Sequence, residues 1–96
     1  MARRRYLITY DVSSDRRRSR IFDILRDHGD HAQYSVFFCE LNGRELAHVR
    51  GQLTEWVHRD EDQILILDLG LAESSLEHGL ETLGKTYQPP VRIQVV

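Results

Sequence analysis

The stretch RYLITYDVSSDRRRSRIF, residues 5–22, decides the fold. Its first half, RYLITYDV, is rich in β-branched and aromatic residues and is followed by two serines, a pattern typical of a strand. Ser13 or Ser14 is suited to cap a helix that begins directly afterwards, with Asp15 in its first turn. The strand therefore ends on a carboxylate, Asp11, and a block of arginines follows within a few residues.

The next segments continue the alternation of strand and helix. Gly29 is a natural stop for the first helix. Residues 31–41, HAQYSVFFCEL, form either one long bent strand or two short strands that share a tight turn. Asn42, with Glu45 three residues later, has the spacing of a capping box and predicts a second helix with an apolar stripe.

The last third of the chain predicts further strands. Residues 58–62, HRDED, are expected to be a solvated acidic loop. Residues 63–70, QILILDLG, are apolar on both faces in their first part, which predicts a central strand. Residues 76–84, LEHGLETLG, are either an irregular strand or an edge, and residues 91–96, VRIQVV, are expected to end the chain as a short strand.

This order predicts an α+β fold, a ferredoxin-like βαββαβ sandwich with an additional C-terminal strand, in a single domain over residues 1–96. A flavodoxin-like parallel sheet is the main rival. Two helices of this length can cover only one face of a small sheet. The other face needs a cover, and in a chain this short we expect a second copy, so the protein is predicted to be a homodimer.

The charge is distributed unevenly along the chain. The net charge is −2, yet the first 20 residues hold seven arginines against two aspartates, and the remainder is acidic. One guanidinium group can bind two oxygens of a phosphate at once. A local basic surface can therefore bind nucleic acid whatever the total charge of the chain. The single cysteine and the lack of a long apolar run predict a cytoplasmic protein that does not span a membrane; the alternative for the arginines is an ordinary solvated helix face.

Asp11 at the end of the first strand is the candidate metal ligand. A carboxylate there is often only a turn or cap acid. Its functional interpretation is a ligand for Mg²⁺, with Mn²⁺ as the alternative ion, because both prefer oxygen. One carboxylate makes a poor site, but a twofold dimer that brought Asp11 against its own copy would supply a pair. A metal ion there would activate water for attack on a phosphodiester, and the nearby arginines would hold the phosphate.

Taken together, YLITYDV, the arginine-rich helix, QYSVFFCEL and ILILDLG in this order resemble the second CRISPR-associated protein family. The resemblance covers roughly residues 5–70, and its two most recognisable marks are the YDV strand end and the Q-x-S-V-F segment. It implies a ferredoxin-like homodimer that takes part in CRISPR adaptation beside an integrase. It also implies a divalent cation held between paired aspartates, and cleavage of RNA or DNA.

Carried over residue by residue, the resemblance places catalysis on Asp11 and Tyr10. The family's helix arginines fall on Arg18 and Arg20, and its segment residues fall on Ser35 and Phe37. Where several members of the family carry an arginine, this chain has His31, which is mostly neutral at pH 7. The full set expected to contact nucleic acid is Arg16, Arg17, Arg18, Arg20, His31 and Ser35.

Phe37 and Phe38 are adjacent on a strand and therefore face opposite sides. One of them is expected in the core and the other at a dimer interface, and Phe37 is assigned to the interface.

Three functions compete on these observations. The first is a metal-dependent endonuclease that uses Asp11. The second is a non-catalytic adaptor that binds duplex DNA and bridges integrase subunits. The third is a single-strand RNA-binding module, which is the weakest because the paired-aromatic RNP1 pattern is absent.

Overall fold

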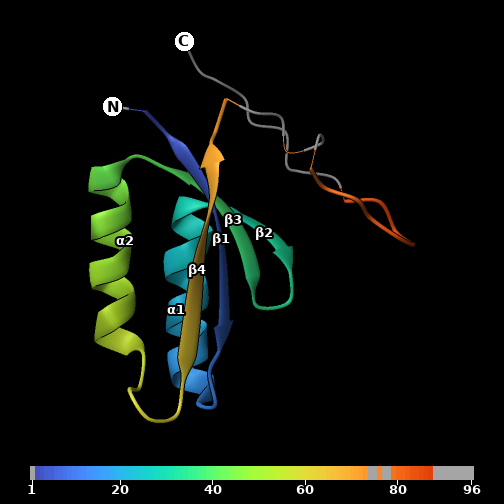
Figure 1. Ribbon diagram of the computed structural model, residues 1–96. Helices are drawn as coiled ribbons and strands as arrows, with labels where there is room; N and C mark the ends of the chain where they lie inside the picture. The colour runs from blue at the N-terminus through green and yellow to red at the C-terminus, as the bar shows by residue number, and fades with distance from the viewer. Residues whose placement is uncertain (1, 74–75, 77–78, 88–96) are drawn as a thin grey trace.

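The computed structural model describes residues 2–73, 76 and 79–87 and shows one mixed α+β unit (Figure 1). Four strands form one sheet and both helices pack against the same face of it. In chain order the elements are β1 (Arg4–Asp11), α1 (Asp15–His28), β2 (Asp30–Gln33), β3 (Val36–Leu41), α2 (Gly43–Trp56) and β4 (Gln63–Leu71).

The sheet has the order β2-β3-β1-β4, and every neighbouring pair of strands is antiparallel. This is the connectivity of a βαββαβ sandwich, so the ferredoxin-like prediction is confirmed and the parallel flavodoxin-like sheet is excluded. The prediction that residues 63–70 form a central strand is wrong for the sheet of the described residues, in which β4 lies at the edge beside β1. β4 is apolar on both faces because one face packs against the helices and the other is an exposed apolar surface, described below.

The helix starts follow the sequence closely. Ser14 caps α1, its side chain accepting a hydrogen bond from the Arg17 backbone N–H. Asn42 caps α2 in a complete capping box with Glu45. Residues 31–41 are not one bent strand: β2 and β3 are separate and meet at a turn in which Ser35 has a positive φ of 64°.

One face of the sheet carries the core. The alternate residues Tyr6, Ile8 and Tyr10 of β1 point toward the helices and are buried with Phe37 of β3 and Ile21 of α1. The remaining buried core residues are Val12, Leu25, Cys39, Leu41, Val49 and Leu53. This face therefore supplies the stability of the single chain.

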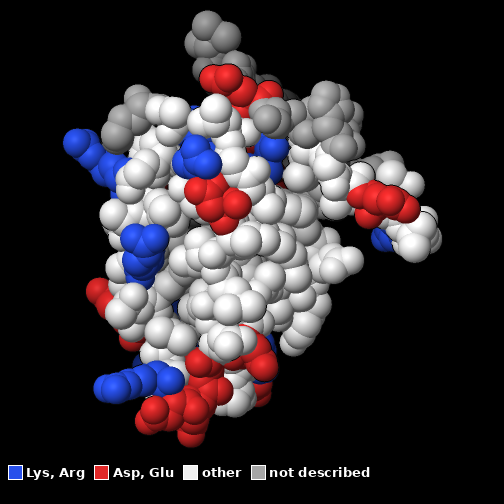
Figure 2. Space-filling model, viewed as in Figure 1, with Lys and Arg blue, Asp and Glu red and all other residues white. Residues whose placement is uncertain are grey.

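The opposite face of the sheet is apolar and has no helix of the described chain over it. Leu7 of β1 lies between Phe38 of β3 and Leu67 of β4, so these three side chains form one row on that face. Leu65 and Leu67 are each 55% exposed. The central part of the space-filling view, over β4, shows few charged atoms, which gather toward its two ends (Figure 2). The second apolar face of β4 is thus an uncovered surface and not the mark of a central strand.

The two strands predicted near the C-terminus are covered only in part by the described residues. The terminal strand expected at 91–96 lies outside the described residues, and the described part of 76–84 contains no strand. Within the described residues no helix has the length and apolarity to cross a membrane.

Candidate nucleic-acid and metal site

Asp11 ends β1 on the uncovered side of the sheet. Side chains alternate along a strand, so Asp11 shares its face with Leu7 and Thr9, opposite to the buried Tyr10. Its cross-strand neighbour is Gln63 at the start of β4. The side chain is exposed and, among the residues the structure describes, it accepts no hydrogen bond and forms no ion pair. The carboxylate is available to a cation or to a second molecule.

Tyr10 faces the core and is only 7% exposed. Its backbone N–H donates to the carbonyl oxygen of Ser35 at 3.1 Å. Burial raises the pKa of Tyr10, and Ser35 partly offsets that rise. The structure thus brings together two predicted site residues, Tyr10 and Ser35, but on the side of β1 away from the Asp11 side chain.

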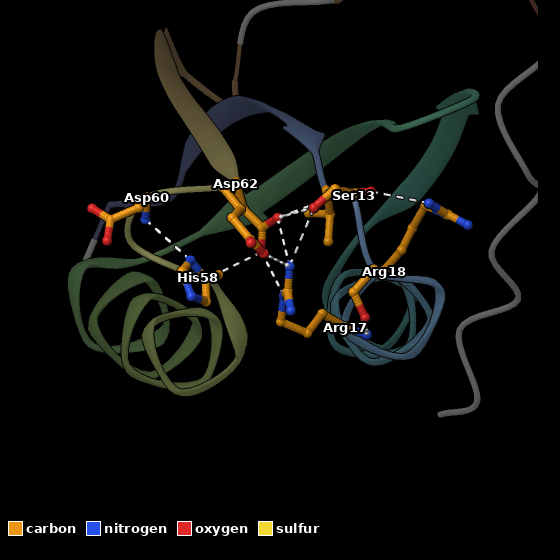
Figure 3. Close-up of polar contacts among 9 residues, drawn as sticks. Ser13, Arg17, Arg18, His58, Asp60 and Asp62 are labelled. Carbon is orange, nitrogen blue, oxygen red and sulfur yellow. Dashed lines mark hydrogen bonds and ion pairs between the residues drawn. The ribbon is translucent and has the colours of Figure 1, made fainter.

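Arg17 and Arg18, at the start of α1, make contacts within the protein. Arg17 binds the Asp62 carboxylate through Nε at 2.7 Å and through Nη2 at 3.1 Å, and Nη2 also reaches Glu61 at 3.1 Å. Arg18 pairs with Asp15, and its Nη1 donates to the carbonyl oxygen of Val12 at 3.0 Å. Both guanidinium groups are therefore directed to the protein (Figure 3).

Arg16 and Arg20 have a different environment. Both are exposed and, within the described part of the chain, neither pairs with a carboxylate. Their guanidinium groups lie over the ring of Trp56 at the end of α2, with Cζ atoms 5.8 and 5.2 Å from the ring centroid. Cation–π contacts hold the side chains in place without neutralising their charge, so these two arginines are the better placed to contact a phosphate.

His31 and Phe37 pack together on β2 and β3. The two rings are stacked with centroids 4.8 Å apart, and Phe22 of α1 meets both rings edge-on. The assignment of Phe37 to a dimer interface is corrected by its burial: at 0% exposure in the core it has no surface to offer a second copy. Phe38, the next residue, lies on the uncovered face, where its ring is 5.8 Å from that of Tyr87.

The residue that sequence reasoning missed is Asp62, in the segment expected to be a solvated loop. Its side chain has no exposed surface. The Arg17 guanidinium, assisted by the backbone N–H groups of His58 and Ser13, holds the pKa of Asp62 well below its ordinary value although burial acts in the other direction. The only signal in the sequence was the opposite charge of the 60–62 acids and the arginine block, and nothing in the sequence shows which acid meets which arginine.

A family model described as CRISPR associated protein Cas2 matches residues 4–75. This chain belongs to the Cas2 family. Among curated relatives, the CRISPR-associated endoribonuclease Cas2 of Geobacter sulfurreducens is 35% identical over 91 residues, covering 95% of each chain. A Cas2 endoribonuclease of Rhodospirillum rubrum is 32% identical over 83 residues, covering 86% of this chain and 80% of that one.

Solved structures agree with this assignment. The crystal structure of Streptococcus pyogenes Cas2 superposes with a TM-score of 0.73 at 28% identity, covering 83% of this chain and 99% of that one. A hypothetical protein of Thermus thermophilus gives a TM-score of 0.77 at 27% identity, covering 92% and 99% of the two chains. The Cas2 fold is thus shared over nearly the whole of both neighbours.

In this Cas2 chain, Asp11 can supply one of the carboxylate ligands of a magnesium site, but not the whole site. Asp11 offers an exposed carboxylate, the oxygen ligand that hard cations prefer. The described residues contain no cluster of three or more His, Cys, Asp or Glu side chains that could hold a metal ion. A complete site therefore needs ligands beyond these described residues, such as a second Asp11, water or a substrate phosphate.

Proposed function

We propose that this chain acts as a homodimeric, metal-dependent endonuclease of a CRISPR system that hydrolyses phosphodiester bonds in nucleic acid. The observation that carries the proposal is the place of Asp11: an exposed carboxylate at the end of β1, without a partner among the described residues, on the same face as the uncovered apolar rows of the sheet. The names of the Geobacter and Rhodospirillum relatives, both endoribonucleases, support the same reaction with RNA as substrate.

The uncovered face favours a dimer. Exposed leucines in register across β1 and β4 lose water contact when a second copy covers them, which stabilises the pair. Asp11 lies on this same face, so two copies that pack by it have their Asp11 carboxylates at or near the interface. Two carboxylates at close range repel each other unless a cation lies between them.

Each residue then has a defined role. Asp11 from each copy would hold Mg²⁺, or Mn²⁺, and such an ion would supply positive charge where negative charge develops in the transition state. Arg16 and Arg20 bind the phosphate backbone beside Trp56, at the end of α2. The backbone hydrogen bond between Tyr10 and Ser35 ties the end of β1 to the turn between β2 and β3.

The test compares the wild type with Asp11→Ala on labelled RNA and labelled duplex DNA, with Mg²⁺ and with excess EDTA. Asp27→Ala, which removes an exposed carboxylate near the opposite end of α1, is the matched control. We expect cleavage by the wild type and by Asp27→Ala only with the metal, no cleavage by Asp11→Ala, and equal binding of nucleic acid by all three. Cleavage by Asp11→Ala at the wild-type rate contradicts the proposal.

The second candidate is a DNA-binding adaptor without turnover that bridges integrase subunits in spacer acquisition. What favours it is that the described residues contain no group of three or more side chains that could hold a metal ion, while Arg16 and Arg20 pair with none of the described acids. If the adaptor role is the correct one, Asp11→Ala keeps spacer integration in cells, whereas replacing Arg16 and Arg20 abolishes it.

A further inference from the structure

The Asp62 carboxylate joins three segments of the chain at one point. Oδ1 accepts a hydrogen bond from the Ser13 backbone N–H at 3.1 Å, in the loop between β1 and α1. Oδ2 accepts from the His58 backbone N–H at 2.8 Å, at the end of α2, and from Arg17 Nε at 2.7 Å. Figure 3 shows these contacts converging on Asp62 between the two helices.

Asp62 and Arg18 hold the two residues that follow Asp11. Ser13 is bound through its N–H to Asp62, and its hydroxyl lies 3.3 Å from Arg17 Nη2. Val12 is bound through its carbonyl oxygen to Arg18 Nη1 at 3.0 Å, and its side chain is buried. The chain cannot shift at Val12 or Ser13 without breaking a charge-assisted hydrogen bond.

Asp11 depends on this backbone for its position. Its own carboxylate has no partner within the described residues, so no side-chain contact there fixes where it stands. On the strand side, Asp11 pairs with Gln63, the residue that directly follows Asp62. Asp62 is therefore connected to Asp11 by two routes, through the Gln63 ladder and through Ser13.

We propose that Asp62 and Arg17 form a positioning pair that fixes the Asp11 carboxylate for binding its divalent cation. This rests on the proposed function, because it assumes that Asp11 is the ligand. In this proposal the Arg17 guanidinium binds the Asp62 carboxylate and does not contact nucleic acid, contrary to the expectation from the sequence. Partners hydrogen-bonded directly to a metal ligand change metal affinity by about 10- to 100-fold, and because Asp62 acts on Asp11 through the backbone we expect the lower end of that range.

Two variants break the pair in different ways. Asp62→Ala removes both carboxylate oxygens that accept from Ser13, His58 and Arg17. Arg17→Lys keeps the positive charge that a phosphate would need but loses the planar fork that binds both oxygens of Asp62. Because Arg17→Lys is the milder change, it keeps the test valid if Asp62→Ala does not fold.

The control is Asp68→Ala. Asp68 also binds an arginine through Nε, at 2.9 and 3.1 Å from Arg4, and accepts a backbone N–H from Gly70 at 2.8 Å. It lies opposite Tyr6 on β4, away from the Asp11 end of the strand. Asp68→Ala therefore measures the cost of losing a similar ion pair that has no connection to Asp11.

The readouts are Mn²⁺ binding by calorimetry, hydrogen exchange of the amides of residues 11–14, and cleavage as a function of Mg²⁺ concentration, all on folded protein. In Asp62→Ala and Arg17→Lys we expect Mn²⁺ binding about tenfold weaker or more, a matching rise in the Mg²⁺ needed for half-maximal cleavage, and faster exchange at residues 12–14. The affinity for nucleic acid stays at the wild-type value in Arg17→Lys. Asp68→Ala behaves as the wild type in all of these.

The outcomes separate the two proposals. Wild-type Mn²⁺ affinity and unchanged exchange at residues 12–14 in both variants overturn the positioning pair, whatever the result for Asp11→Ala. If Arg17→Lys weakens nucleic-acid binding while leaving Mn²⁺ binding intact, Arg17 is a phosphate contact and the pair is likewise overturned. If the wild type binds no Mn²⁺ and cleaves neither RNA nor DNA, the proposed nuclease function is refuted. Faster hydrogen exchange at residues 12–14 in the two variants would in that case show that Asp62 and Arg17 order the loop after β1 but position no metal ligand.

Discussion

Replacing Leu67 by alanine should weaken the proposed dimer by an amount that the structure sets. Leu67 is 55% exposed in the single chain. Full burial of a leucine side chain stabilises by about 1.5–3 kcal/mol, so covering the exposed half contributes about 1 kcal/mol. Twofold symmetry places two such side chains in one interface, so Leu67→Ala should cost about 2 kcal/mol and raise the dimer Kd roughly 30-fold.

The assay is sedimentation equilibrium over a range of protein concentrations, since the change appears directly as a shift of the monomer–dimer midpoint. Leu71→Ala is the control, because Leu71 is on the same strand and is 44% exposed. A bulge in β4 places Leu71 opposite Arg4 and turns its side chain to the helix-facing side of the sheet, away from the proposed interface. Leu67→Glu should raise the Kd further, because it also places a charge in the interface. An equal change in Leu67→Ala and Leu71→Ala, or a wild type that stays monomeric at every concentration, would refute the use of this face.

The polar contacts and the packing lead to three more predictions. Arg16→Gln with Arg20→Gln should lower the slope of log Kd against log salt for duplex DNA by about 0.9 for each phosphate that is no longer neutralised, whereas Arg17→Lys should leave it unchanged; titrations at several salt concentrations decide this. Because the pKa of Asp62 is depressed on folding, its contribution to stability is present above the unfolded pKa of about 4 and is lost as pH falls through the lower folded value. Urea midpoints of the wild type and Asp62→Asn should therefore differ at pH 7 and converge in strong acid; a constant gap argues against the ion pair. Gly29→Ala should destabilise by about 1–3 kcal/mol, since its Cβ would lie 2.4 Å from Cys39 Sγ, while Gly51→Ala, with open space around it, should raise Tm.

The fold was predictable because local signals and the overall topology agree. Alternation marks β1, a serine and an asparagine cap the two helices, and short connections leave few ways to arrange the elements. The error at β4 has a physical cause. A strand that is apolar on both faces can be central, or it can be an edge strand whose second face awaits a partner, and one chain's sequence does not distinguish these cases.

The candidate site was only partly predictable. Asp11 stands out because a lone acid ends an apolar strand, a purely local pattern. Asp62 could not be identified because its contacts to Ser13 and Arg17 span 49 and 45 residues, and burial of a charged side chain leaves no periodic trace in the sequence. Phe37 and Phe38 were recognised as facing opposite sides, but which of them meets the helices depends on the register of β3 against β1.

The arginine block therefore carries two different kinds of residue, and this changes the expected shape of the basic surface. Arg17 and Arg18 are compensated by nearby acids, so their fields largely cancel at the distance of a bound strand. Arg16 and Arg20 keep their charge and are held over Trp56 on the side of α1 that packs toward α2. Asp11 lies on the other side of the sheet from the helices. A nucleic acid bound through Arg16 and Arg20 must therefore pass around the β1–α1 corner to reach Asp11, and that corner is the segment that Asp62 holds.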